Sequence, residues 1–95
     1  MVAGKRLNDE QAAEIAISGL TFLAGEPEAL GRFLTLAGIG PGDLRQVARE
    51  PGFLAGVLEF FMADESLLMA FAEATAIRPT MIAAARFALS GGDPG

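Results

Sequence analysis

The fold of this chain is decided within Leu36–Leu44, which reads Leu-Ala-Gly-Ile-Gly-Pro-Gly-Asp-Leu. Gly38 suits the left-handed conformation that ends many helices, and Ile39 is the apolar residue that folds back onto the helix just ended. Pro41 has the fixed backbone angle that favours the first turn of a new helix. The stretch therefore predicts a tight turn between two helices.

Similar signals for helix starts recur along the chain. Asn8 with Gln11 predicts a capping box, Asp43 with Gln46 predicts another, and Asp64 can cap a later helix. Helices are expected to begin at Asn8, Pro27, Asp43, Pro51, Asp64 and Pro79. Apolar residues follow each start at helical spacing, and no segment alternates with the period of a strand. The sequence predicts an all-α fold, a compact bundle of five or six short helices.

The first and fourth helices carry the most specific expectations for the core. On the first helix, the inward stripe is expected to comprise Ala13, Ala16, Ile17, Leu20, Leu23 and Ala24. The fourth helix is apolar nearly all round, which is typical of a helix that is central or contacts another chain. We expect a single helical domain over residues 8–90, with flexible segments at 1–7 and 91–95.

The two halves of the chain resemble each other through a shift of 38 residues. The identical pairs are Leu20/Leu58, Phe22/Phe60, Leu30/Leu68, Phe33/Phe71, Ile39/Ile77 and Pro41/Pro79. The period lies in the range of helical repeats. Either two helical hairpin units form a pseudo-repeat, or unrelated helix pairs share Leu and Phe at core positions. A pseudo-repeat predicts that Ile39 and Ile77 are both buried beneath turns of related geometry.

Composition excludes several classes of protein. The chain has 95 residues, no Cys and no His, and a net charge of −5, which disfavours nucleic acid as a partner. Its longest uncharged run, Ile15–Gly25, has 11 residues, whereas a membrane span needs about 20. The basic start at Met1–Arg6 is followed by Asn8, Asp9 and Glu10 and not by an apolar segment. We expect no signal peptide, no membrane contact and a cytoplasmic location.

The polar residues do not predict an active site. Most carboxylates occupy helix starts, where they favour the helix dipole and lack the burial that acid–base catalysis requires. The hydroxyl residues have no His to activate them, and Lys5 is the only lysine. We therefore expect a protein that is not an enzyme, with no catalytic residue, no cofactor and no metal.

The Gly38-Ile39-Gly40 turn resembles the helix-hairpin-helix motif that binds DNA without reading its sequence. In that motif backbone N–H groups hold a phosphate, so the possible phosphate contacts are Gly38, Gly40, Arg45 and Arg49. Three features depart from the motif. Gly42 stands where a basic residue often assists, Asp43 brings a carboxylate to the site, and the second copy of the turn lacks both glycines. Sequence-independent DNA binding is the alternative function.

The favoured function is a non-enzymatic protein-interaction module, which would bind a partner protein or a second copy of itself. Its possible partner surface consists of Phe53, Phe60 and Met62 on the fourth predicted helix. Phe60 lies off the main apolar stripe of that helix. It is either buried in the core of a small domain or exposed in a groove or dimer surface.

The chain also resembles an uncharacterised bacterial family of small helical proteins, a domain of unknown function. The resemblance runs from Leu7 to Leu89 and is most specific in Leu20–Ala24, in Leu36–Leu44, and from Glu50–Leu54 through Asp64–Ser66. It implies a compact helical protein of the bacterial cytoplasm. No established activity, cofactor or partner comes with it.

Overall fold

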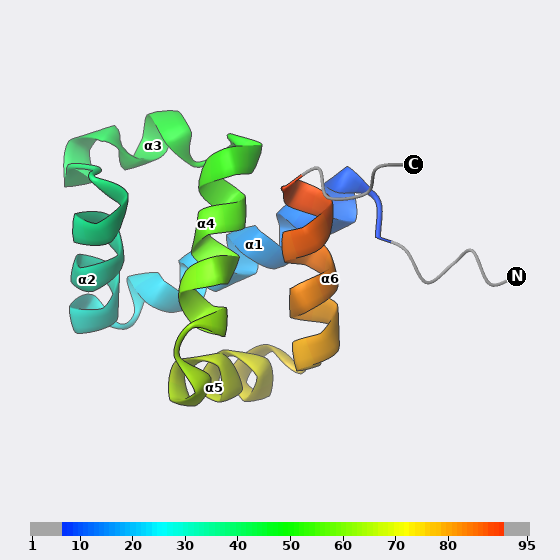
Figure 1. The fold of residues 1–95 in the computed structure, drawn as a ribbon. Helices are drawn as coiled ribbons and strands as arrows, with labels where there is room; N and C mark the ends of the chain where they lie inside the picture. Colours follow the sequence, from blue (N-terminus) through cyan, green and yellow to red (C-terminus); the bar gives the residue numbers. More distant parts are fainter. Residues whose placement is uncertain (1–6, 91–95) are drawn as a thin grey trace, which may run out of the picture.

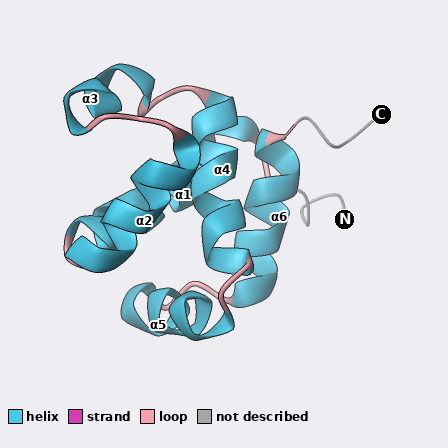
Figure 2. Cartoon of the chain, turned by 60° about the vertical axis from the view of Figure 1, so that its left-hand side comes forward, coloured by secondary structure: helices cyan, strands magenta, loops and turns pink. Residues whose placement is uncertain are grey.

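A computed structural model describes residues 7–90 of the chain, and every regular element in it is helical (Figures 1 and 2). The elements are α1 (Asp9–Ala24), α2 (Pro27–Ala37), a 3-10 turn (Pro41–Asp43), α3 (Leu44–Val47), α4 (Pro51–Met62), α5 (Glu65–Thr75) and α6 (Pro79–Leu89). The predicted all-α bundle of short helices is confirmed. Of the segments expected to be flexible, 1–7 and 91–95, only Leu7 is described, and it packs against the core.

The helix starts follow the local chemistry of the sequence. The Gln11 backbone N–H donates to Asn8 Oδ1 at 2.7 Å, and the Asn8 N–H donates to Gln11 Oε1 at 3.2 Å. Asp64 Oδ1 accepts from the Leu67 N–H at 3.1 Å. Proline occupies the start of three further helices, namely Pro27, Pro51 and Pro79. These predicted caps are confirmed. They could be predicted because each depends on residues only a few positions apart.

The capping box predicted at Asp43 and Gln46 is wrong. Asp43 has helical backbone angles, not the extended angles of an N-cap residue, and its side chain caps nothing. Its N–H, which the Gln46 side chain would accept from in a capping box, donates to the Gly40 carbonyl at 2.9 Å within the 3-10 turn. The turn runs directly into α3, so no extended cap residue separates them. The single-turn helix α3 has no fully buried residue, and its apolar residues Leu44 and Val47 are half-buried.

The inward stripe predicted for α1 is also partly wrong. Its buried residues are Ala12, Ala16, Gly19 and Leu23. Ile17, expected inside, is 43% exposed, and the predicted Ala24 is exposed as well. Three of the four buried residues are Ala or Gly, and the helix packs mainly against α4 and α6. Small residues let the helix axes approach closely, so tertiary packing overrides the most hydrophobic face of the helix.

The core lies where α1, α4 and α6 meet, with α5 across one end (Figure 1). The rings of Phe61 and Phe71 stack there with their centroids 4.5 Å apart. Phe22 packs against both rings at 5.9 and 5.8 Å. On the other side, α2, α3 and α4 form three sides of an open frame (Figure 1). The frame contains the candidate functional site.

The pseudo-repeat predicted from the sequence has a structural counterpart. The bounds of α2 and α5 coincide after the shift of 38 residues. Gly38 at the end of α2 has φ 71° and ψ 30°, and Ala76 at the end of α5 has φ 60° and ψ 27°. Ile39 and Ile77 are half-buried, less than predicted, and both pack against the core. The correspondence stops afterwards, since Pro41 begins a 3-10 turn and Pro79 begins the longer helix α6.

Replacing Ala76 with Gly is expected to stabilise the protein by roughly 1 kcal/mol, because a left-handed alanine is strained by about that amount. The converse change, Gly38→Ala, is expected to destabilise it by a similar amount. Denaturant unfolding of both variants measures the two effects. If Ala76→Gly lowers stability, the left-handed turn after α5 is not the strained counterpart of the turn after α2.

Candidate partner-binding groove

An apolar groove runs between α2 and α4. It consists of two adjoining hollows of about 240 and 310 Å³. The first is lined by Phe33, Ala37, Ile39, Val47, Glu50, Gly52, Phe53 and Gly56. The second is lined by Phe33, Leu36, Ala37, Gly56, Glu59, Phe60 and Ala63. Because Phe33, Ala37 and Gly56 line both hollows, we treat them as one site, the α2–α4 groove.

Three aromatic rings form the deep side of the groove. Phe33 on α2 is buried and meets Phe53 and Phe60 on α4, with ring centroids 5.5 and 5.4 Å apart. Both contacts are edge-to-face, which is a favoured geometry for aromatic pairs. The rings therefore join α2 to α4.

Glycine residues leave the α4 wall of the groove open. Gly52 and Gly56 lie one helical turn apart, and a Cβ atom added at either would meet nothing within 4 Å. A glycine inside a helix costs roughly 0.5–1 kcal/mol relative to alanine, and no packing contact here offsets that cost. The two glycines therefore preserve an open surface of helix backbone.

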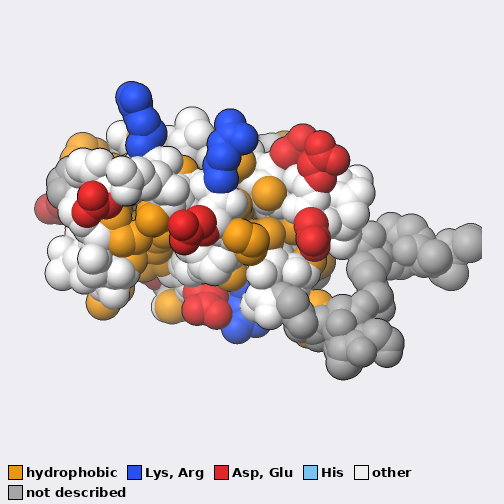
Figure 3. Space-filling model, turned by 90° about the horizontal axis from the view of Figure 1, so that it is seen from above, with side chains coloured by type: hydrophobic (Ala, Val, Ile, Leu, Met, Phe, Trp, Pro, Cys, Tyr) orange, Lys and Arg blue, Asp and Glu red, His pale blue; other side chains and the backbone are white. Residues whose placement is uncertain are grey.

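An exposed leucine marks the rim of the groove. Leu36 on α2 is 77% exposed, the highest value among the large apolar residues that the structure describes. Seen from above, hydrophobic side chains show between scattered charged ones at the left-hand end of the molecule, where α2 and α3 lie in Figure 1 (Figure 3). A single exposed leucine is ordinary, but one adjoining an apolar groove extends the apolar surface that a partner can cover.

The charged residues lining the groove are acidic. Glu50 lies at the first hollow and Glu59 at the second. Glu59 Oε2 accepts from Arg86 Nη2 at 3.0 Å and from Arg86 Nε at 3.3 Å, yet its side chain is 53% exposed. Arg32 lines neither hollow. Its guanidinium lies 5.4 Å from the centroid of the Phe60 ring and 3.7 Å from Asp64 Oδ2.

Two of the three predicted partner-surface residues line the groove. Phe53 and Phe60 are half-buried and line opposite ends of it. Phe60 is thus neither wholly core nor a free patch, since its ring packs on Phe33 beneath Arg32. Met62 is 41% exposed and lines neither hollow. Leu36 and the pair Gly52/Gly56 were not predicted from the sequence as part of the site. The spacing of the two glycines, one helical turn apart within an apolar helix, was the signal that could have indicated them.

The predicted phosphate contacts lie in surroundings that do not favour an anion. The Gly38 N–H already donates to the Thr35 carbonyl at 3.2 Å. Asp43 Oδ2 lies 3.5 Å from the Cβ position of Gly40, so a carboxylate stands beside the turn. Arg45 and Arg49 are exposed on or just after a helix of a single turn. DNA binding stays an untested prediction, and these contacts weigh against it.

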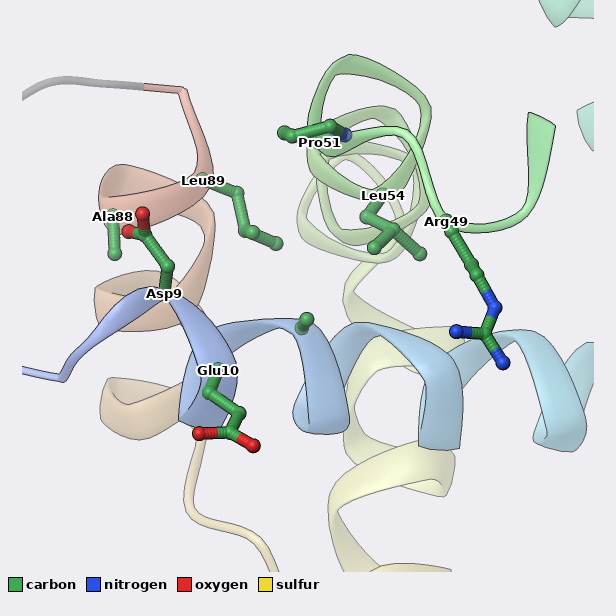
Figure 4. A pocket seen from close by; sticks show the side chains of 8 residues that line it. Asp9, Glu10, Arg49, Pro51, Leu54, Ala88 and Leu89 are labelled. Atoms are coloured by element: carbon green, nitrogen blue, oxygen red, sulfur yellow. The ribbon is translucent and has the colours of Figure 1, made fainter.

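Arg49 borders a different hollow of about 360 Å³ where α1, α4 and α6 converge (Figure 4). Leu89 points from α6 into the space between the helices, Leu54 points from α4 toward α1, and the Arg49 side chain reaches down to α1 (Figure 4). Asp9 and Glu10 bring the opposite charge to its edge. This mixture of charges selects no ligand class. Within residues 7–90, no group of His, Cys, Asp and Glu side chains is placed to hold a metal ion.

Within residues 7–90, no single helix combines the length and apolar character needed to cross a bilayer. The pair α5 and α6 reaches that threshold jointly, but the two helices are bent by 103° at the break between them.

Fold and site together define a small all-α domain with an apolar groove between two helices. The chain belongs to DUF3572, a family of proteins of unknown function, whose sequence pattern matches residues 9–92. The family resemblance inferred from the sequence is thereby confirmed. No curated protein and no solved structure is similar enough to this chain to match it.

Proposed function

We propose that this protein is a non-enzymatic interaction module that holds a helix of a partner protein in the α2–α4 groove. The observation that carries the proposal is the groove itself, which joins an aromatic floor, a glycine-backed wall and the exposed Leu36. Water contacting this surface would be released when a partner covers it, and that release favours binding.

The shape of the groove favours a helix over a small molecule. Small-molecule sites are usually enclosed cavities of roughly 300–1,000 Å³ that bury most of the ligand. Here two hollows of about 240 and 310 Å³ follow each other along one helix, and both are open to solvent and do not enclose a ligand. A trough of this kind suits an amphipathic helix that inserts one apolar side chain into each hollow.

The residues at the groove support binding and not chemistry. Its titratable lining residues are Glu50 and Glu59, and Arg86 holds one oxygen of the latter. The sequence has neither the His nor the Cys that most often serve as base or nucleophile. An interaction module needs only the apolar surface and its rim.

Site-specific photo-crosslinking in the native cells tests the proposal. Benzoylphenylalanine placed at Leu36 is expected to cross-link one partner protein, and mass spectrometry should locate the linked residue on an amphipathic helix. The matched control carries the same group at Phe87 on α6, which is 49% exposed and far from the groove in sequence. The control is expected to give no such product.

A second variant makes the result specific to the groove. Gly56→Leu should fill the space between the hollows and suppress the Leu36 cross-link at least about tenfold. It should also keep or raise the melting temperature, because its Cβ meets nothing and leucine favours a helix. The proposal fails if the cross-link survives Gly56→Leu in a folded protein, if the Phe87 position yields the same product, or if the linked molecule is a second copy of this chain.

A further inference from the structure

We infer that the partner helix carries two apolar side chains seven residues apart, flanked by Lys or Arg. This inference rests on the proposed function and specifies its ligand. It follows from the spacing of the two hollows along α4 and from the charge of the residues beside them.

The spacing comes from repetition along α4. The first hollow takes Gly52, Phe53 and Gly56 from this helix. The second takes Gly56, Glu59 and Phe60 from α4, and Ala63 from just after its end. Gly56 borders both hollows, but each hollow has one α4 phenylalanine of its own, Phe53 in the first and Phe60 in the second, and these two lie seven residues apart. Seven residues correspond to roughly 10 Å, or two helical turns. A partner helix lying along α4 rises equally per residue, so its two anchors repeat at the same interval on one face.

The charge preference comes from the acidic rim. Glu50 borders one hollow and Glu59 the other, so a carboxylate stands near each anchor. Among the described residues, Arg86 forms an ion pair with Glu59, and the Glu59 side chain stays half-exposed. The whole chain, with these two glutamates included, carries a net charge of −5. Complementary Lys or Arg would speed association and exclude acidic helices.

The same requirements argue against a second copy as the occupant. Two chains of charge −5 repel each other. Within residues 7–90, the exposed large apolar residues are Ile17, Leu36, Met62, Met69, Met81 and Phe87. Met81 and Phe87 share a helix but are six residues apart, whereas Met62 and Met69 are seven apart on different helices. No described helix of this chain therefore presents the required pair.

Synthetic peptides test the inference on the intact protein. The first is an Ala-rich helix of about 20 residues, long enough to be helical, with two Leu seven residues apart and Lys beside each. The second has the Leu residues five apart, which separates them by about 140° around the helix. The third replaces Lys with Glu. Amide NMR signals of Gly52 and Gly56 report occupancy of the groove, and fluorescence anisotropy gives the dissociation constants.

The first peptide is expected to shift both glycine signals and to bind at least about tenfold more tightly than the other two. Gly56→Leu should abolish its binding, and added salt should weaken it. Equal binding of all three peptides at the groove would overturn the inference and leave the proposed function standing. A Leu36 cross-link to a helix that lacks this spacing or charge would likewise overturn the inference and leave the proposed function standing. Absence of both the cross-link and the glycine shifts would overturn the proposed function itself.

Discussion

Phe61→Ala is expected to lose about 3–5 kcal/mol of unfolding free energy, the range typical of a buried aromatic truncated to alanine. Phe61 is fully buried, with none of its surface exposed. Its ring stacks on Phe71 at 4.5 Å and also meets Phe22 and Phe60 at 5.9 and 6.4 Å. It links helices α1, α4 and α5, so the cavity would open where their packing converges. Guanidinium unfolding followed by far-ultraviolet circular dichroism measures the loss.

The expected loss is a large fraction of the stability of a domain this size, since small domains are stable by roughly 5–15 kcal/mol. Phe87→Ala is the matched control, because the same truncation removes a ring that is 49% exposed. The control should change stability by no more than about 1 kcal/mol. Should Phe61→Ala cost as little as the control, the Phe61–Phe71 stack would not be the centre of the core.

The helix starts could be predicted from the sequence because their chemistry is local. Asn8 and Gln11 exchange hydrogen bonds across three residues, and Asp64 caps the N–H of Leu67. Proline at the first position of a helix likewise needs no distant partner. Where a competing local interaction existed, the prediction was wrong. The Asp43 N–H is used by the 3-10 turn, which the capping pattern does not reveal.

The inward face of α1 could not be predicted from hydrophobicity. A periodic pattern selects Ile17 over Gly19, yet the structure exposes the isoleucine and buries the glycine. Burial of a glycine depends on which side chain fills the space beside it, and here that side chain comes from α4. The turn after α5 shows the same limit. Ala76 adopts the left-handed conformation although the sequence has no glycine there.

The groove could not be predicted from the sequence, because it depends on the distance between α2 and α4, which no local sequence pattern contains. Phe53 and Phe60 could be singled out because they fall on an unusually apolar helix. Leu36 could not, since its exposure follows from the way α2 stands apart from α4 across the Phe33 ring. Met62 belonged to the same predicted surface, but helical geometry turns it away from Phe60 by about 160°. The sequence of one helix does not show which neighbouring helix packs against it. That neighbour decides which face of the helix stays exposed.

Gly19→Ala is expected to destabilise the protein by about 1–3 kcal/mol, although alanine is the better helix former. A Cβ at this position would lie 2.9 Å from Phe61 Cε2 and 3.4 Å from both Phe71 Cζ and Val57 Cγ1. The Phe61 ring cannot swing away, because Phe71 stacks on its face at 4.5 Å and other rings surround it. Thermal and guanidinium unfolding of the variant measure the cost.

Two further variants test whether crowding against Phe61 causes the loss of stability in Gly19→Ala. Gly56→Ala makes the same chemical change where a Cβ meets nothing within 4 Å, so it should stabilise the protein by roughly 0.5–1 kcal/mol. Phe61→Leu removes part of the ring that a Cβ at residue 19 would strike. In its background, Gly19→Ala should cost less than in the native chain, with a coupling energy of about 0.5–3 kcal/mol. Additive effects of the two substitutions would show that Gly19 is required for another reason, because contact with the Phe61 ring necessarily couples them.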